Sequence, residues 1–167
     1  MTAGSRKPII SATRWLKWSF PEGRGWTRWR RFTNATIAEA PIDAGTYALG
    51  ISRSGGLGRL LGADPHAVLD IGRSVTLRSR LSTLKACADT PKMTGHMAGW
   101  RLGTLGLLHR LGVTSSDDLR VSWSPQPDVT AAHHHESFLL RAYFELFGEL
   151  PPLNYQTNWA AYVDDEL

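Results

Sequence analysis

Apolar and polar residues follow three short patterns that predict β-strands. Residues 46–52 (TYALGIS) alternate between larger apolar side chains and small or polar ones, and they are rich in β-forming residues. Residues 67–71 (AVLDI) form a second run, and residues 119–124 (LRVSWS) form a third. Between the first two runs, a glycine-rich stretch that continues to Pro65 predicts a flexible connection.

Helical spacing of apolar residues appears in three other segments. Residues 75–88 place three leucines at positions i, i+4 and i+7, which predicts one buried helix face. Residues 95–111 predict a second helix that three glycines weaken, and residues 131–147 give the clearest helical pattern. Gly148 and the two prolines that follow it predict where this last helix ends.

The order of these elements is strand, strand, helix, helix, strand, helix. It predicts an α+β fold with a small three-stranded, mostly antiparallel sheet flanked by helices. We expect this domain to span residues 41–157, with an N-terminal arm over residues 1–40 and a C-terminal tail over residues 158–167.

Charge changes this picture mainly at the N-terminus. The net charge of the chain is +4 and its pI is about 9.6, but residues 1–31 hold eight Lys/Arg and one acid. Four tryptophans lie among these cations, and such an arm can bind phosphates and stack on bases. Alternatively, the tryptophans pack the arm on the body and the charges are solvated. The first interpretation predicts nucleic-acid contacts from Arg14, Trp15, Lys17, Trp18, Arg28, Arg30 and Arg31.

Two features bear on the cellular compartment. Cys87 is the only cysteine, so no intrachain disulfide can form, which suits a reducing cytoplasm. No apolar run approaches the roughly 20 residues of a membrane span, and no hydrophobic segment follows the N-terminal basic residues. We therefore expect a cytoplasmic protein that neither crosses a membrane nor carries a secretory signal.

Two strand-borne motifs carry the strongest functional signal. Gly45-Thr46-Tyr47 begins the first predicted strand, and Asp70-Ile71-Gly72 ends the second one about 25 residues later. This pair resembles the signature of the GIY-YIG nuclease superfamily, with Asp70 in place of the second tyrosine. The resemblance spans roughly residues 41–155, and the family's core has the strand and helix order predicted above.

Further positions agree with the resemblance. Arg73 and Ser74 follow the second motif, and Arg80 lies ten residues beyond Asp70 in a helix (TLRSRL) that resembles the family's arginine-bearing helix. His96 falls where many relatives carry a histidine. Glu136 opens the last long helix as the family's metal-binding glutamate does, and Asn154 lies in a similar terminal motif (LPPLN).

The resemblance implies a divalent-metal-dependent DNA endonuclease that hydrolyses phosphodiester bonds. Glu136 would hold Mg²⁺ (or Mn²⁺), which needs few protein ligands because it keeps several waters. The alternative is an ordinary acid favoured by the helix dipole. Arg80 would clamp the phosphate, with Arg78 as a competing candidate on the same helix. Arg73 and Arg78 are also expected to contact the nucleic acid.

Roles for the remaining catalytic candidates also have structural alternatives. Tyr47 would orient or deprotonate a water, and a phenol does so only if nearby cations lower its pKa. It could instead fill one face of the sheet. His96 would bond this phenol or protonate a leaving group, or serve structure beside Trp100. Asn154 would tie the terminal segment to the site, or simply occupy a turn.

Asp70 could be a second metal ligand, a better base than tyrosine, or a charge that repels phosphate. The last possibility favours a non-catalytic nucleic-acid-binding protein, and a protein-interaction domain is a third hypothesis. A homodimer is possible, because cutting both strands often needs two sites. Consecutive His133, His134 and His135 cannot easily share one ion on a helix, so we interpret them as a solvated helix terminus.

Overall fold

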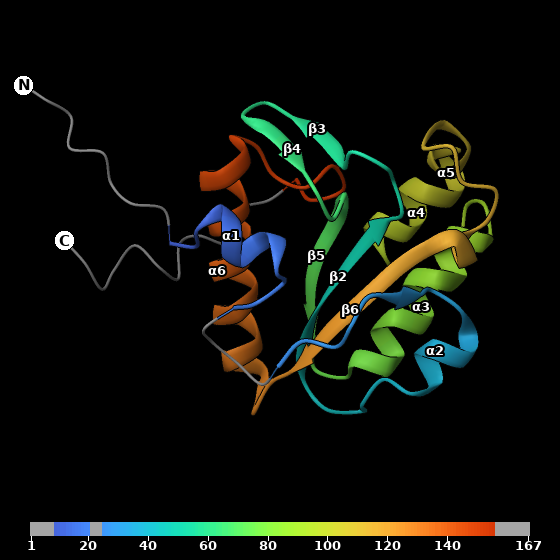
Figure 1. Ribbon diagram of the computed structural model, residues 1–167. Coiled ribbons are helices and arrows are strands. Elements are labelled where there is room, and N and C mark those ends of the chain that lie inside the picture. The colour runs from blue at the N-terminus through green and yellow to red at the C-terminus, as the bar shows by residue number, and fades with distance from the viewer. Residues whose placement is uncertain (1–8, 21–24, 156–167) are drawn as a thin grey trace, which may run out of the picture.

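The main sheet has four strands. The computed structural model describes residues 9–20 and 25–155, and it has the predicted α+β fold. The sheet order is β1 (Arg30–Arg31), β6 (Leu119–Pro125), β2 (Gly45–Ile51) and β5 (Val68–Ser74), and every neighbouring pair is antiparallel. β3 (Leu57–Arg59) and β4 (Gly62–Asp64) form a separate two-stranded hairpin (Figure 1).

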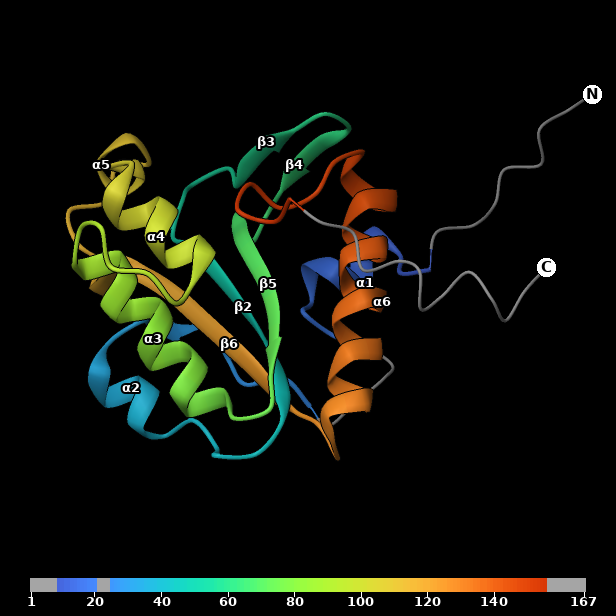
Figure 2. The same cartoon turned by 180° about the vertical axis from the view of Figure 1, so that it is seen from behind.

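Helices cover both faces of this sheet. α3 (Leu77–Asp89) and α4 (Met97–Thr104) pack on one face, with α2 (Asn34–Ala38) beside α3. α6 (Val129–Phe147) packs on the other face together with α1 (Ala12–Leu16). α5 (Leu107–Arg110) and a 3₁₀ turn (Ser116–Asp118) complete the described elements. β5 runs between α3 and α4 on one side and α6 on the other (Figure 2).

The prediction of a three-stranded sheet is wrong. β1 has only two residues, which is too short to show an alternating pattern, and it pairs with β6 through Arg30 and Arg31. The glycine-rich stretch predicted as a flexible connection folds into the β3–β4 hairpin, whose strands have three residues each. The three long strands follow one another along the chain as predicted. Strands of two or three residues leave no periodic signal in a sequence, so β1, β3 and β4 were not expected.

The segment predicted as one helix over residues 95–111 is two helices. Gly106 separates α4 from α5 in the left-handed conformation, with φ of 61°. Glycine adopts this conformation without the steric cost that other residues meet. α4 begins later than predicted, and His96 is its N-cap residue, so the imidazole precedes the helix.

Two apolar clusters stabilise the fold, one on each face of the sheet. Tyr47 and Leu49 of β2 belong to the cluster under α3 and α4, whereas Ala48 belongs to the cluster under α6. Residues before position 41 contribute to both clusters, since Trp15 lies in the second and Phe32 in the first. Full burial of one large apolar side chain stabilises a fold by about 1.5–3 kcal/mol, so these early residues help to hold the domain together.

Within residues 9–20 and 25–155, no helix combines the length and the apolar character that crossing a membrane requires. The predicted tail over residues 158–167 lies outside the described residues.

Candidate active site

The pairing of β2 with β5 brings the two sequence motifs together. Tyr47 lies opposite Gly72, and Leu49 lies opposite Asp70. The register then shifts, so that Gly50 pairs with Val68. Because paired residues and residues two positions apart share a face of a sheet, Asp70 lies on the same face as Tyr47, and the shift comes only after this pair. The Asp70 carboxylate accepts a hydrogen bond of 2.9 Å from the Tyr47 hydroxyl.

Both motif glycines are explained by close packing. A Cβ on Gly72 would overlap the Oη and Cζ atoms of Tyr47, so the tyrosine ring lies directly across this residue. A Cβ on Gly45 would collide with Leu77 of α3 and with the carbonyl oxygen of Ser124 on β6. The glycines therefore allow the phenol to cross β5 and allow α3 to approach β2.

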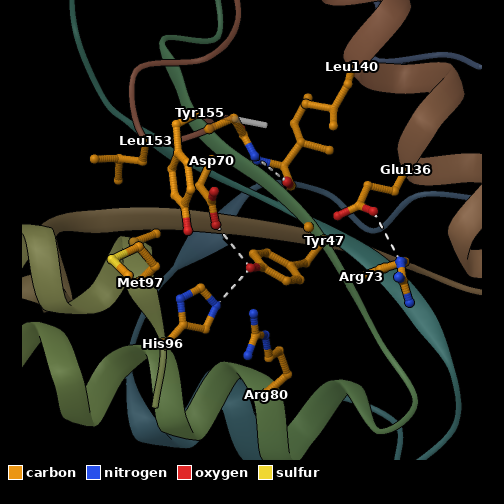
Figure 3. A pocket seen from close by; sticks show the side chains of 14 residues that line it. Tyr47, Asp70, Arg73, Arg80, His96, Met97, Glu136, Leu140, Leu153 and Tyr155 are labelled. Carbon is orange, nitrogen blue, oxygen red and sulfur yellow. Dashed lines mark hydrogen bonds and ion pairs between the residues drawn. The ribbon is translucent and has the colours of Figure 1, made fainter. Parts of the chain in front are cut away.

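His96, Tyr47 and Asp70 form one directed chain of hydrogen bonds (Figure 3). The Nδ1 atom of His96 accepts from the backbone N–H of Gly99, at 3.5 Å, as the N-cap of α4. In the neutral imidazole the proton is then on Nε2, which lies 2.8 Å from the Tyr47 hydroxyl oxygen. His96 therefore donates to Tyr47, and Tyr47 donates to Asp70.

Burial sets the protonation states in this chain. It lowers the pKa of His96 to about 3, and the positive charge of Arg80 adds to this effect. Burial also raises the pKa of Asp70 to about 6, against the hydrogen bond from Tyr47 and the charge of Arg80, which lower it. At neutral pH the imidazole is therefore uncharged, and Asp70 is mainly ionised.

Tyr47 does not become a phenolate base in this environment. Burial raises its pKa well above the ordinary value, and the charge of Asp70 adds to the increase. Arg80 lowers this pKa, as expected from the sequence, but its effect is smaller. Tyr47 can thus pass a proton on to Asp70, but it does not ionise alone.

Arg80, and not Arg78, faces the site. Arg80 lies on α3 beside the Tyr47 phenol, and its Nη1 atom is 3.5 Å from the carbonyl oxygen of Gly95. Its Nε atom is buried and has no hydrogen-bond partner within the described part of the chain. Arg78 is exposed and donates to the carbonyl oxygen of Ala40.

Glu136 reaches the site from the opposite face of the sheet, on α6. Its Oε2 atom accepts from the Nε atom of Arg73 at 3.1 Å, and its side chain is only 10% exposed. The ion pair joins β5 to α6 across the sheet edge. Arg73 was predicted to contact nucleic acid, and in this conformation part of its charge is neutralised by Glu136.

The carboxylates of the cavity fit a hydrated Mg²⁺ ion in number and in chemical type. Two carboxylates, Asp70 and Glu136, line the same cavity, and Mg²⁺ in proteins often binds through one or two carboxylates and several waters. A preformed cage is absent, since no cluster of three or more His, Cys, Asp or Glu side chains suited to a metal occurs in residues 9–20 and 25–155. Glu136 would hold such an ion, and Arg73 would then share its carboxylate or move aside.

Asn154 attaches the C-terminal segment to the free edge of β5. Its side chain accepts from the backbone N–H of Ile71 at 2.9 Å and donates to the carbonyl oxygen of Ile71 at 2.8 Å. The backbone N–H of Leu153 also donates to the carbonyl oxygen of Leu69. The amide thus replaces a neighbouring strand, which explains how a distant residue comes to close the site.

All six predicted catalytic residues line a single cavity of about 320 Å³. They come from β2, β5, α3, α6, the loop before α4 and the segment after α6. Residues of β5 line it together with residues of α3 and α4 from one helical layer and of α6 from the other. The six residues are Tyr47, Asp70, Arg80, His96, Glu136 and Asn154.

Sequence reasoning missed two residues at the rim. Tyr155 lines the cavity and is 53% exposed, and the guanidinium of Arg101 lies 4.4 Å from the centre of its ring. Arg101 also donates to the carbonyl oxygen of Leu153, at 3.4 Å, and its charge lowers the pKa of Asp70. No motif marks either residue, although Tyr155 directly follows Asn154.

The predicted nucleic-acid-binding residues of the arm differ in their exposure and in their bonding partners. Trp15 is fully buried and donates to Asp64, and Trp18 is half-buried and donates to Ser122, which accords with packing of the arm on the body. Arg30 is paired with Glu39, and Arg31 is paired with Asp118. Arg31 is exposed despite this pair, and Arg14, Lys17 and Arg28 are exposed as well.

The interpretation of His133, His134 and His135 as a solvated helix terminus is wrong for the third residue. His135 is buried, its Nδ1 atom lies 2.7 Å from the Thr46 hydroxyl, and Gln126 lies 2.8 Å from the same atom. Burial lowers the pKa of His135 to about 4. This histidine therefore links α6 to β2 as an uncharged side chain.

Comparisons with known proteins give no relative: no protein-family model, no curated protein and no solved structure matches this chain.

Proposed function

We propose that this chain is a divalent-metal-dependent DNA endonuclease of the GIY-YIG type, which hydrolyses phosphodiester bonds. The observation that carries the proposal is the cavity itself. Six side chains that are far apart in the sequence line it, and they include an arginine, two carboxylates and a phenol. These are the groups that phosphodiester hydrolysis requires for phosphate binding, metal binding and proton transfer.

Asp70 acts as the proton acceptor in this proposal. As the attacking water is deprotonated, its proton passes to the Tyr47 oxygen while the Tyr47 proton moves to Asp70 over the 2.9 Å hydrogen bond. His96 keeps the Tyr47 oxygen in place by donating to it. A base with a pKa near 6 suits catalysis close to neutral pH. The aspartate therefore takes over the part that the resemblance gives to tyrosine.

Arg80 binds the scissile phosphate. Its guanidinium lines the cavity, and the bond from its Nη1 atom to the carbonyl oxygen of Gly95 is long, at 3.5 Å, so that phosphate oxygens can compete for its N–H groups. A guanidinium keeps its charge and can bridge two phosphate oxygens. Glu136 would hold the divalent ion, which when bound would stabilise the negative charge on the phosphate and on the leaving oxygen.

DNA is the proposed partner because the exposed cations Arg14, Lys17 and Arg28 add positive charge outside the cavity. A homodimer would supply two cavities for cutting both strands. The single thiol of Cys87, which is buried and free, accords with a cytoplasmic location.

A non-catalytic nucleic-acid-binding protein is the second candidate. One observation favours it: Glu136, the proposed metal ligand, is bound to Arg73 in an ion pair. If this pair persists in the presence of metal ions, the cavity can bind phosphate through Arg80 without cutting it.

Plasmid cleavage separates the two candidates. The purified full chain is incubated with supercoiled DNA and Mg²⁺ or Mn²⁺, and with EDTA. We expect metal-dependent nicking that falls by about 100-fold or more in Arg80→Ala and in Glu136→Gln. Arg110→Ala is the matched control, because Arg110 is exposed on α5 and does not line the cavity.

Circular dichroism of each variant tests whether it is folded. Binding without cleavage under every metal condition would leave the second candidate. Cleavage that persists unchanged in folded Glu136→Gln would contradict the proposed site.

A further inference from the structure

A second cavity of about 330 Å³ adjoins the candidate active site. Its lining is mainly apolar and comes from Thr94, Gly95, His96, Met97 and Trp100. His96 and Met97 also line the first cavity, so the two spaces meet at these residues. The first cavity is polar and contains Arg80, whereas the second presents an indole and a thioether.

The loop between α3 and α4 holds the two cavities in a fixed relation. Gly95 has φ of 124°, a conformation that other residues rarely adopt, and its carbonyl oxygen lies 3.5 Å from Arg80 Nη1. His96 caps α4 and bonds Tyr47. Trp100 lies one turn along α4 and donates its backbone N–H to His96. The apolar wall is thus anchored to the phosphate-binding arginine and to the phenol.

We propose that this second cavity binds an unpaired nucleobase, next to the phosphate held at Arg80. The proposal rests on the proposed function, and it adds the class of substrate. A suitable occupant must place an anionic group at Arg80 and a flat apolar group against Trp100, in adjoining spaces. A nucleotide unit of a DNA strand has both groups, and aromatic side chains bind bases of any sequence by stacking.

Base pairing decides which DNA can use the cavity. A base inside a duplex is stacked and paired, and it must be unstacked before it enters a protein pocket. A base in a single strand, a flap or a bulge is already accessible. The site therefore favours DNA with an unpaired nucleotide beside the bond that is cut.

Binding to matched single-stranded probes tests this inference. One fluorescein-labelled probe is a thymidylate dodecamer, and the other has the same phosphates but only abasic sites. Affinities are measured by anisotropy in EDTA at low salt. We expect wild-type protein to bind the thymidylate probe about tenfold more tightly than the abasic probe.

Trp100→Ala should bring this ratio close to one while affinity for the abasic probe is unchanged. Trp100→Phe should keep the preference, because an aromatic face remains. Met97→Ala is the second variant, since Met97 is 49% exposed and its truncation is tolerated more readily; it should lower the ratio about threefold.

A preference that is unchanged in Trp100→Ala and Met97→Ala would overturn the inference, because the base would then bind elsewhere on the protein. Equal losses on both probes would also overturn it, since the variants would then act on phosphate binding. The test needs no cleavage. Absence of cleavage would count against the nuclease alone, and a ratio that ignores Trp100 would count against the base site alone.

Discussion

At the scale of single residues, Asp70 determines how the site works. The carboxylate accepts a hydrogen bond from the Tyr47 hydroxyl, and its pKa is about 6, whereas the proposed GIY-YIG resemblance would place a phenol at this position. The cost is burial of a negative charge beside a second acid, since Glu136 also raises the pKa of Asp70. A charge that destabilises the fold is typical of functional sites.

The first prediction concerns the stability of Asp70→Asn. Burial raises the folded pKa of Asp70 from 3.8 to about 6, so the ionised side chain disfavours the folded state above that pH. The stability contribution of Asp70 is complete below pH 4 and is lost as pH rises through 6. Asparagine keeps the acceptor for Tyr47 and carries no charge. Relative to wild type, Asp70→Asn should therefore gain up to about 3 kcal/mol between pH 4 and pH 7.5.

Urea unfolding followed by circular dichroism at several pH values measures this difference. DNA cleavage measured in parallel should fall by about 100-fold or more, because asparagine accepts no proton. A stability difference that is independent of pH would show that Asp70 titrates normally and would contradict the proposed base.

The cavity-lining residues could be predicted because the family resemblance gives their spacing along the chain. Arg80 and Arg78 cannot be separated by helical periodicity, and the position ten residues beyond Asp70 selects the one that lines the cavity. The pairing of Glu136 with Arg73 could not be predicted, because residues 63 positions apart meet only after the fold forms. The sequence left open whether Trp15 is buried or contacts nucleic acid for the same reason, since its partner Asp64 is distant in sequence.

At the scale of elements, the packing of β2 against β5 leads to the second prediction. Gly72→Ala puts a methyl group where the Tyr47 ring lies. Overpacking of this kind costs about 1–3 kcal/mol, and it should displace the phenol from Asp70 and lower cleavage. Gly58→Ala on β3 is the matched control, because a Cβ there meets no atom within 4 Å.

A double-mutant cycle identifies the cause. In a Tyr47→Ala background the added methyl group has space, so Gly72→Ala should cost about 1 kcal/mol less than in wild type. Equal costs in both backgrounds, measured by urea unfolding, would show that the glycine is needed for a reason other than the ring.

Elements with a full period were predictable from the sequence, and short ones were not. The seven-residue strands β2 and β6 show alternation, β5 shows a short apolar run, and the 19-residue α6 shows helical spacing. Strands of two or three residues have too few positions for a pattern, so the fourth strand and the hairpin were missed. The register that puts Asp70 on the same face as Tyr47 is also invisible in a sequence, because it depends on strand pairing.

At the scale of the whole molecule, each face of the sheet contains a buried, uncharged histidine. His96 lies under the helical layer of α3 and α4, and His135 joins α6 to β2. Burial lowers their pKa values to about 3 and about 4. Both remain unprotonated in the folded chain at pH 5, whereas the unfolded chain binds a proton at each.

The third prediction follows from this imbalance. Stability that the two histidines provide above pH 6.5 is lost on acidification, by about 2 kcal/mol each between pH 7 and pH 5. Asp70 has the opposite effect on the free energy of unfolding. It stabilises the fold by about 1 kcal/mol between pH 7 and pH 5, because it becomes protonated more readily in the folded chain than in the unfolded chain. Urea unfolding should therefore show a net loss of roughly 2–3 kcal/mol for these groups.

Substitution of His135 separates its contribution to the acid-induced loss of stability from that of His96. Glutamine can accept the same hydrogen bonds without titrating, so in His135→Gln the loss between pH 7 and pH 5 should shrink by about 2 kcal/mol, whatever the stability of the variant at pH 7. His134→Gln is the matched control, because His134 precedes His135 on the same helix and is exposed. If both variants have the pH dependence of wild type, His135 binds protons equally well in the folded and unfolded chains, and acid lability has its origin elsewhere in the molecule.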